Sequence, residues 1–326
     1  MAKSKIVGID IGTNMLKLVY VDGDKVVSTI NVALPDKLVQ NNRVVSIETM
    51  SELIKDALKE NNIKATKAGL VLNGDQVFVR TLTMPQMSAD QLLYNIPYEF
   101  KDYIEGELKD YVYDFSMVST LDEMKAMEEN KTMEVMAAAC PKKLIEDCRD
   151  MTRKAGLKLT NLAPVVTCYG NVIRHLNEDS TKEYGIIDIG YEAIRLHIFT
   201  GDCYNITRKL EIGMKDLDSI VANLFNVDIH LAHTYFVNNY ENCQDSEDCQ
   251  RVFNNISIEI NRALNFYRFN NPESQLNDLY LCGGGACVES LKQSIKESIE
   301  VNVHDVTDLF ANANEFDLQA IGIALD

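Results

Sequence analysis

The stretch Ile9-Asp-Ile-Gly-Thr-Asn-Met-Leu-Lys-Leu-Val-Tyr-Val-Asp-Gly-Asp24 has a counterpart later in the chain, Ile187-Asp-Ile-Gly-Tyr-Glu-Ala-Ile-Arg-Leu-His-Ile-Phe-Thr-Gly-Asp202. Seven of the sixteen positions are identical without a gap, at a constant offset of 178 residues. Both copies predict a strand, an Asp-x-Gly turn, a second strand and a Gly-Asp turn into a third strand. A gapless match that includes both turns favours an internal duplication over two unrelated β-hairpins.

A duplicated Asp-x-Gly hairpin is suited to binding phosphate. Glycine lets the backbone approach a ligand closely, and successive turn amides form a nest for anions. An aspartate before the turn can hold a hydrated Mg²⁺, which keeps most of its waters. Two such hairpins facing each other across a cleft would clamp a polyphosphate. Lys17 on the outgoing strand would reach the phosphate as a point charge; the alternative is an ordinary solvent-facing lysine.

A third element lies late in the chain, in Leu279-Tyr-Leu-Cys-Gly-Gly-Gly-Ala286. The residues predict a short apolar strand and a triple-glycine turn, and a helical pattern follows through Val288, Leu291, Ile295 and Ile299. Three glycines between a strand and a helix permit a ligand to approach the helix N-terminus closely. A glycine-rich turn is weak evidence alone, and it gains weight after two Asp-x-Gly hairpins.

Together with the closing run Ala320-Ile-Gly-Ile-Ala-Leu325, these elements resemble the actin-like ATPase fold, an α/β fold of two duplicated, ribonuclease-H-like lobes. Within it the chain is most similar to the PilM family of type IV pilus assembly, and next to the cell-division protein FtsA. The segments that carry the PilM resemblance are Arg80–Pro85 with Ser88–Leu93, Ala138–Lys143 with Ala155-Gly156-Leu157, Arg208–Gly213, and Ile258–Tyr267.

The resemblance implies a set of ATP and Mg²⁺ contacts, position by position. The first phosphate loop would be Asp10, Gly12, Thr13, Asn14 and Lys17, and the second Asp188 and Gly190, with Gly213 near the phosphates. The nucleoside would lie against Gly283, Gly284 and Gly285, with Glu259 or Arg262 near the base or ribose. Asp10 and Asp188 would hold Mg²⁺ through water. For Glu259 and Arg262 the alternative is an exposed face of a charged helix.

Some positions depart from the family pattern. Tyr191 stands where a small residue commonly follows the second Asp-x-Gly and would crowd or cap the γ-phosphate pocket, and Met214 replaces a common second glycine. Hydrolysing relatives offer a Gln, Glu or Asp to orient the attacking water, whereas the corresponding run Asn161–Thr167 contains none. Positioning and electrostatics supply most of phosphoryl-transfer catalysis. The sequence therefore supports ATP binding better than hydrolysis, which is expected to be weak or absent.

The same resemblance predicts how the chain is divided into lobes and subdomains. Residues 1–82 form the core of the first lobe, to which 163–183 and 303–326 return, and 83–162 form an inserted subdomain of the FtsA and PilM kind. The second lobe covers 184–302, with a peripheral helical subdomain at about 215–275. A Met-rich hairpin loop is expected at Asp122–Asn130, and a solvated loop at Tyr240–Asp248.

Composition excludes several classes of protein. The chain has 326 residues, 32 basic and 49 acidic, for a net charge of −17. That charge repels nucleic acid and anionic lipid, and no basic tract offsets it. No signal peptide or 18-residue apolar run is found, and the eight cysteines lack Cys-x-x-Cys spacing, as expected in the reducing cytoplasm. His230 and His233 favour a helix surface over a metal site, since no third ligand is evident.

The PilM resemblance implies a cytoplasmic ATP-binding scaffold. It would dock the N-terminal peptide of a PilN-like membrane protein, and so recruit the pilus assembly platform to the inner face of the membrane without inserting into it. One alternative is an FtsA-like polymer-forming membrane tether. The chain stops at Asp326, directly after the closing helix and without an amphipathic membrane helix, which argues against a tether. The other alternative is a small-molecule kinase or phosphatase of the same fold, for which no catalytic acid or base is evident.

Overall fold

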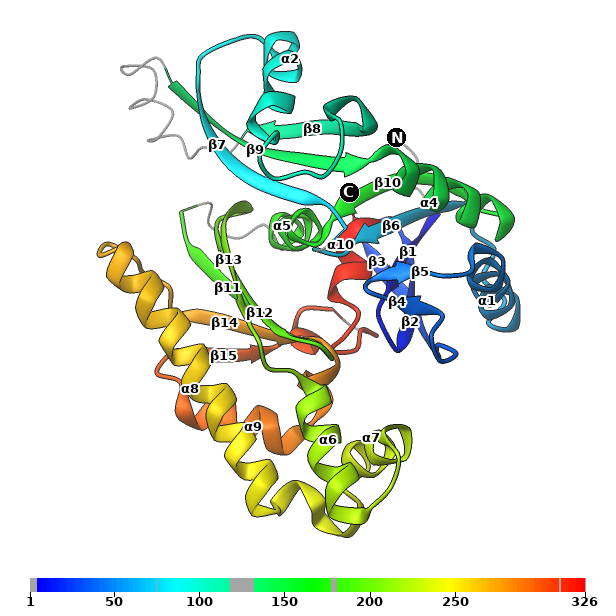
Figure 1. Cartoon of the computed structure of the whole chain (residues 1–326), viewed down its shortest axis with the longest axis vertical. Helices are drawn as coiled ribbons and strands as arrows, with labels where there is room; N and C mark the ends of the chain where they lie inside the picture. The colour runs from blue at the N-terminus through cyan, green and yellow to red at the C-terminus, as the bar shows by residue number, and fades with distance from the viewer. Residues whose placement is uncertain (1–4, 75, 118–131, 177–180, 311, 326) are drawn as a thin grey trace. The chain divides into compact units, whose positions relative to one another are not determined.

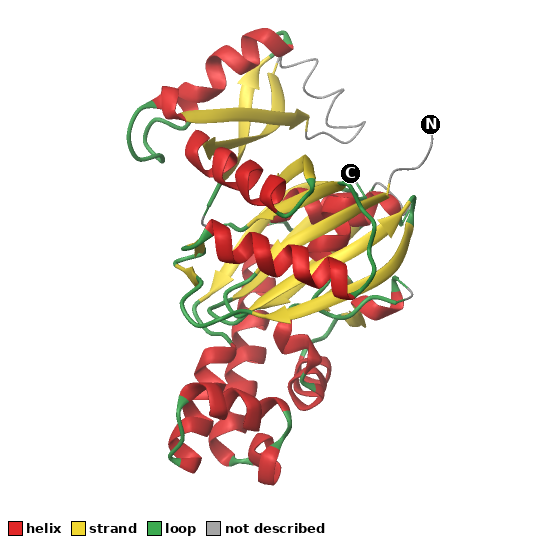
Figure 2. Ribbon diagram, turned by 90° about the vertical axis from the view of Figure 1, so that its right-hand side faces the viewer, coloured by secondary structure: helices red, strands yellow, loops and turns green. Residues whose placement is uncertain are grey.

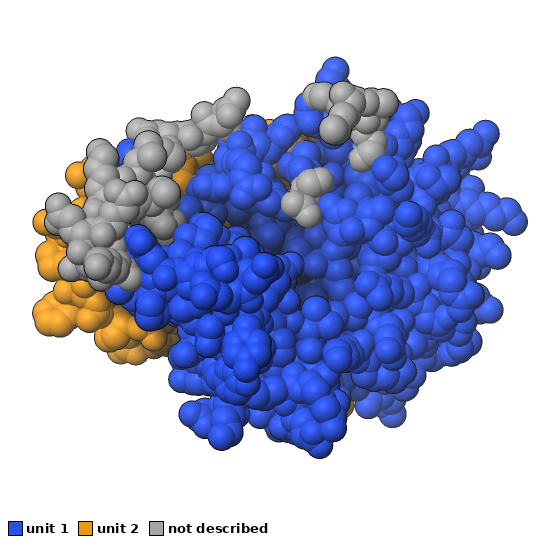
Figure 3. Space-filling view, turned by 90° about the horizontal axis from the view of Figure 1, so that it is seen from above, with its two compact units in different colours: residues 1–181, 202–204, 319–326 blue, residues 182–201, 205–318 orange. Residues whose placement is uncertain are grey.

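A computed structural model describes residues 5–74, 76–117, 132–176, 181–310 and 312–325. The chain divides into two compact units, coloured separately in Figure 3. Unit 1 comprises Met1–Thr181, Asp202–Tyr204 and Gln319–Asp326, and unit 2 comprises Lys182–Gly201 and Asn205–Leu318. Unit 1 is therefore built from three separate segments of chain, the last of which returns from the C-terminal end.

Each unit is built on a five-stranded sheet, and the two sheets have the same topology (Figure 1). In unit 1 the order is β10-β6-β1-β2-β3, and in unit 2 it is β15-β14-β11-β12-β13. The strands of unit 1 are β1 Lys5–Ile11, β2 Met15–Asp22, β3 Lys25–Ala33, β6 Lys67–Leu72 and β10 Lys158–Pro164. Those of the second sheet are β11 Glu183–Ile189, β12 Ile194–Thr200, β13 Cys203–Leu210, β14 Asp278–Cys282 and β15 Asn302–Asp305.

The duplication extends to the pairing of individual residues. Asp10 lies opposite Lys17 in the antiparallel pair β1–β2, and Asp188 lies opposite Arg195 in β11–β12. In both sheets the first hairpin strand also pairs in parallel with a later strand, β6 or β14. Identical strand order and identical register confirm that the two halves share one architecture, as the repeated sequence predicts.

Alternation along β1 directs its residues to two layers of helices, which cover both faces of the sheet (Figure 2). Val7 and Ile9 enter a core with α1 (Ile47–Glu60) and α4 (Lys142–Lys154). Gly8 faces α10 (Leu318–Ala324), where an added Cβ would lie 1.8 Å from the Ala320 carbonyl oxygen. Only glycine permits this contact, so the closing helix packs directly on the backbone of the first strand. α5 (Val165–His175) follows β10.

A small sheet in unit 1 has a core of its own. Its strands are β7 Phe78–Pro85, β8 Tyr111–Met117 and β9 Thr132–Pro141, in the order β7-β9-β8. α2 (Ala89–Glu99) packs on it through Leu92 and Ile96 and begins with a capping box formed by Ser88 and Gln91. The 3₁₀ turn η1 Leu108–Asp110 leads into β8. The predicted loop Asp122–Asn130 lies outside the described residues.

The helices of unit 2 bury one apolar face each against its sheet and against one another. They are α6 Met214–Phe225, α7 Ile229–Val237, α8 Glu247–Asn270 and α9 Glu289–Ser298, with short 3₁₀ turns η2 Tyr240–Asp245, η3 Gly284–Cys287 and η4 Val306–Asp308. The prediction of a solvated loop at Tyr240–Asp248 is wrong for its centre. Cys243 and Gln244 are buried there, and the Gln244 amide donates to the Phe236 carbonyl at 2.7 Å.

Candidate functional site

The first Asp-x-Gly hairpin contains a buried charged pair. Asp10, at the end of β1, is 1% exposed, and its Oδ2 accepts a hydrogen bond from Lys17 Nζ at 2.8 Å. Its other oxygen, Oδ1, is buried and has no hydrogen-bond partner among the described residues. A buried carboxylate oxygen without a partner is costly, so this atom fits a ligand that supplies a donor, such as a metal-bound water.

The turn beside Asp10 is closed by the backbone. Gly12 N–H donates to the Met15 carbonyl at 2.9 Å, and the Asn14 carbonyl accepts from Leu34 N–H at 2.9 Å. Thr13 is partly buried and Asn14 is exposed. The structure thus brings all five residues predicted for the first phosphate loop into one hairpin, Asp10 and Lys17 as a cross-strand pair and the other three in the turn.

The second hairpin meets the glycine-rich turn. Asp188 pairs in register with Cys282, and Gly283 follows with φ +89°. A Cβ on Gly283 would lie 2.4 Å from Asp188 Oδ1 and 2.7 Å from the Ile189 carbonyl oxygen. Both the positive φ and the close approach therefore require glycine at this position.

The hairpin also caps α6. The Gly190 carbonyl accepts from Met214 N–H at 3.2 Å, and the Tyr191 carbonyl accepts from Lys215 N–H at 3.0 Å. Gly213 N–H donates to Asp216 Oδ2 at 2.9 Å, and a Cβ on Gly213 would lie 2.4 Å from the Tyr191 carbonyl oxygen. Gly213 therefore lies directly against the hairpin, and its own amide is engaged by Asp216.

The three glycines of the turn have different surroundings. Gly285 packs against Ile189 and Met214, and Met214 is buried in the core of unit 2. A Cβ on Gly284, in contrast, would meet no atom within 4 Å. Gly284 is thus the glycine of the three at which the backbone faces open space and a flat ligand could approach.

Tyr191 is held by a neighbouring histidine. Its ring packs edge-on against His233 on α7, with 6.2 Å between the ring centroids. His233 Nδ1 lies 2.8 Å from Oδ2 of the fully buried Asp218 on α6, and this hydrogen bond raises the pKa of His233. Over the described ranges, no group of three or more His, Cys, Asp or Glu is placed to hold a metal ion.

The remaining predicted site residues lie elsewhere in unit 2. Glu259 and Arg262 are on α8, three residues apart, and form an ion pair with each other. Arg262 is largely exposed, so the pair stands on the outer face of its helix. Their predicted contact with the base or ribose stays a prediction.

Unit 1 contains an apolar pocket of about 220 Å³ that no motif in the sequence indicates. Its apolar lining residues include Ile11, Ile47 and Leu70, together with Leu144 and Met151 from α4. The full lining is Ile11, Asn42, Arg43, Val44, Ile47, Leu70, Val71, Asn73, Gln76, Pro141, Lys143, Leu144, Asp147, Cys148 and Met151. Asn42, Arg43 and Val44 in this lining belong to a two-stranded ribbon of β4 (Val39–Gln40) and β5 (Arg43–Val44). Asn41 and Asn42, with φ of 49° and 57°, form the turn between these strands, and an Asn-Asn pair is a signal for such a turn.

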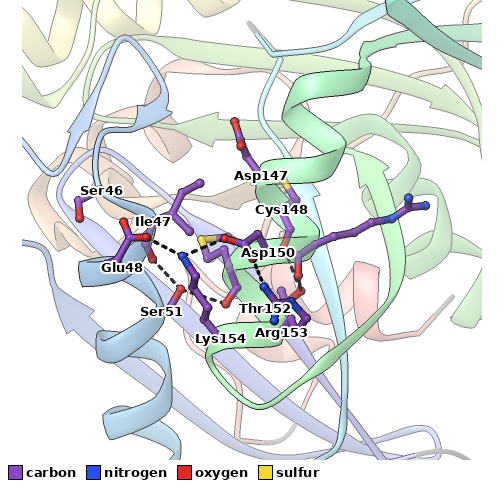
Figure 4. A network of polar contacts seen from close by, with 12 residues as sticks. Ser46, Ile47, Glu48, Ser51, Asp147, Cys148, Asp150, Thr152, Arg153 and Lys154 are labelled. Atoms are coloured by element: carbon purple, nitrogen blue, oxygen red, sulfur yellow. Dashed lines mark hydrogen bonds and ion pairs between the residues drawn. The ribbon is translucent and has the colours of Figure 1, made fainter.

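Polar contacts hold the two helices beside the pocket together (Figure 4). Ser51 on α1 is buried, and its Oγ lies 2.6 Å from the Ile47 carbonyl oxygen and 3.0 Å from that of Met151 on α4. Lys154 Nζ adds ion pairs to Glu48 at 2.5 Å and to Asp150 at 2.9 Å. Because Ile47 and Met151 both line the pocket, these contacts join two of its walls.

The two matched sheets, each with an Asp-x-Gly hairpin at one strand end, define the actin-like ATPase fold. The structure is similar to that in the PilM–PilN type IV pilus biogenesis complex, with a TM-score of 0.84, 23% identity, and coverage of 99% of this chain and 98% of that one. It is also similar to the ethanolamine utilization protein EutJ from Carboxydothermus hydrogenoformans, with a TM-score of 0.61, 14% identity, and coverage of 98% of this chain and 88% of that one.

A further similar structure is the activator of 2-hydroxyisocaproyl-CoA dehydratase from Clostridium difficile with bound ADPNP, with a TM-score of 0.51, 10% identity, and coverage of 98% and 93%. No curated protein sequence matches significantly. A family model described as type IV pilus assembly protein PilM matches residues 8–318. The chain belongs to the PilM family of type IV pilus assembly proteins.

Proposed function

We propose that this protein is a nucleotide-binding scaffold of type IV pilus assembly that docks the N-terminal peptide of a PilN-like inner-membrane protein. The observation that carries the proposal is the family match over residues 8–318. The chain-long similarity to the PilM–PilN complex supports it. No helix among the described residues is long and apolar enough to cross a membrane. In this proposal the PilN-like partner supplies the membrane location, and the protein itself stays in the cytoplasm.

The pocket of unit 1 is the proposed seat of the partner peptide. At about 220 Å³ it is smaller than the sites that enclose a whole drug-sized molecule, and it suits side chains of a longer ligand. Much of its lining is aliphatic, and the amide side chains of Asn73 and Gln76 that also line it are held by hydrogen bonds within unit 1. An extended peptide with aliphatic side chains matches this lining.

The hairpins and the glycine-rich turn are the proposed nucleotide contacts. In unit 1, Asp10 would hold a Mg²⁺-bound water through its buried Oδ1, while Lys17 would place its charge beside the phosphates. In unit 2, Asp188 and Gly190 would supply the second phosphate loop, and Gly284 an open backbone for the nucleoside. Bound Mg²⁺ would neutralise phosphate charge. We propose binding and not turnover, since Asn161 in β10 and Thr167 in α5 bracket a run without an acid or Gln.

The peptide assignment is tested by calorimetry with a synthetic N-terminal peptide of the PilN-like partner. Leu144→Asp places a charge in the pocket and is expected to abolish binding, because burying an unpaired carboxylate is costly. Leu231→Asp is the matched control, since Leu231 is an exposed leucine on α7 of unit 2. Binding by Leu144→Asp with unchanged affinity would refute the pocket as the peptide site, and no binding by the wild type would refute the docking function.

A further inference from the structure

The pocket and the first phosphate hairpin share one strand end. Ile11 is the last residue of β1 and lines the pocket, and its two chain neighbours are the hairpin residues Asp10 and Gly12. Ile11 is buried, and its side chain belongs to the core that unit 1 forms with α1 and α4. A ligand that touches Ile11 from the pocket thus acts one residue away from the buried carboxylate.

A chain of side-chain amides fastens this strand end to the rim of the pocket. Asn73, which follows β6, donates from Nδ2 to the Ile11 carbonyl at 2.8 Å. The backbone N–H of Asn73 donates to Gln76 Oε1 at 3.1 Å, and Gln76 Nε2 donates to the Asn42 carbonyl in the β4–β5 turn. Asn73, Gln76 and Asn42 all line the pocket.

From this geometry we propose that filling the pocket and binding nucleotide phosphate strengthen each other through Asn73 and Gln76. The proposal rests on the two sites of the proposed function and adds a regulatory link between them. The bistable element is the end of β1, with the Asn73–Ile11 hydrogen bond formed or broken. Both ligands favour the formed state, because an apolar ligand packs on an ordered Ile11 and a phosphate needs an ordered Asp10–Gly12 turn.

Linkage makes the proposal quantitative. Two ligands that favour the same state must raise each other's affinity by one common factor. Asn73 is a positioning residue here, since it acts on the phosphate hairpin through the Ile11 carbonyl. The coupling factor, and not either affinity alone, is therefore the quantity that reports its role.

The experiment measures both affinities of the full-length protein by calorimetry. The Kd of the partner's N-terminal peptide is determined with and without saturating Mg·ADPNP, and the Kd of Mg·ADPNP with and without saturating peptide. In the wild type each ligand is expected to lower the other's Kd by the same factor, of at least about 5-fold. A factor of one in the wild type, with both ligands binding, overturns the coupling and leaves the proposed function standing.

Variants then locate the link. Asn73→Ala removes the donor to Ile11, and Gln76→Met removes the next step at similar side-chain length. Each is expected to bring the coupling factor to about one, whatever its effect on the separate affinities. Leu144→Ala is the control, because it trims the α4 wall of the pocket and should weaken the peptide while keeping the full factor.

If both amide variants keep the wild-type factor, the proposed route is wrong. Loss of the factor in Leu144→Ala as well would also count against it, because coupling would then depend on pocket filling in general. Absence of peptide or nucleotide binding in the wild type would remove the proposed function, and the coupling with it.

Discussion

At the scale of single residues, the most informative atom is Oδ1 of Asp10. The sequence places Asp10 and Lys17 seven residues apart, and the register of the β1–β2 hairpin brings them face to face. What could not be read from the sequence is that Lys17 satisfies only one carboxylate oxygen and that the other is buried without a hydrogen-bond partner in the described structure. That oxygen is buried by the fold of unit 1 as a whole, which the hairpin sequence alone does not show.

Asp10→Asn is expected to abolish stabilisation by Mg·ATP. A ligand at 100 times its Kd adds roughly 2.7 kcal/mol to the free energy of unfolding, and the variant should gain almost none of it. Its unliganded stability should fall by about 1.5–3 kcal/mol, because Lys17 loses a charged partner. Thermal unfolding with and without nucleotide measures both. Asp22→Asn, in the same hairpin but exposed, is the control, and a full response from Asp10→Asn would contradict the assigned role.

A second residue sets a pH dependence. His197 on β12 is 2% exposed, its Nδ1 lies 2.8 Å from Thr207 Oγ1, and burial lowers its pKa to about 3. The unfolded chain binds a proton near pH 6.5 that the folded chain does not, so stability is lost as the pH falls below that value. Between about pH 7.5 and 5.5 the loss should be roughly 1.4 kcal/mol.

The measurement is urea unfolding of the wild type and of His197→Asn, which keeps a polar partner for Thr207 but does not titrate. Other titrating groups cancel in the difference between the two proteins. The variant's stability relative to the wild type should therefore rise by roughly 1.4 kcal/mol from pH 7.5 to 5.5. A difference that stays constant with pH would show that His197 is protonated in the folded protein.

At the scale of elements, two glycines of the glycine-rich turn have different surroundings: Gly283 is needed for the backbone geometry, and Gly284 faces open space. Gly283→Ala should destabilise the protein by about 2–4 kcal/mol, because it combines a positive φ with contacts to Asp188 and Ile189. Gly284→Ala should stay within about 0.5 kcal/mol of the wild type, since its Cβ meets nothing. Denaturant unfolding compares them. Equal losses would contradict the geometry, and weaker nucleotide binding by Gly284→Ala alone would support the nucleoside contact.

The repeat predicted most of the two sheets. The hairpin strands of both halves, and the strand before the triple glycine, were readable because apolar residues and turn glycines mark them locally. The β4–β5 ribbon was not, because two-residue strands carry no periodicity, and Asn41-Asn42 was not read as its turn. The pocket could not be predicted from the sequence for a different reason. Ile11, Asn73 and Met151 are far apart in sequence, and only the parallel pairing of β1 with β6 and the packing of α4 bring them together.

At the scale of the whole molecule, the net charge of −17 opposes an anionic membrane. The protein alone is expected not to co-sediment with vesicles that contain anionic lipid, at any ionic strength low enough to leave charges unscreened. Vesicles that carry the partner's N-terminal peptide on a lipid anchor should retain it, and Leu144→Asp should remove that retention. Co-sedimentation of the wild type with bare anionic vesicles would contradict a membrane location that depends on the partner.

The contact between Gly8 and the Ala320 carbonyl has a consequence for biosynthesis. Apart from Asp202–Tyr204, unit 1 takes no residue between Thr181 and Gln319, so its first strand must wait for its closing helix. At roughly 5–20 residues per second, the stretch between them takes roughly 7 to 28 seconds to synthesise. During that interval the face of β1 that contacts α10 stays uncovered on the ribosome. We expect a nascent-chain chaperone to bind this uncovered face of β1.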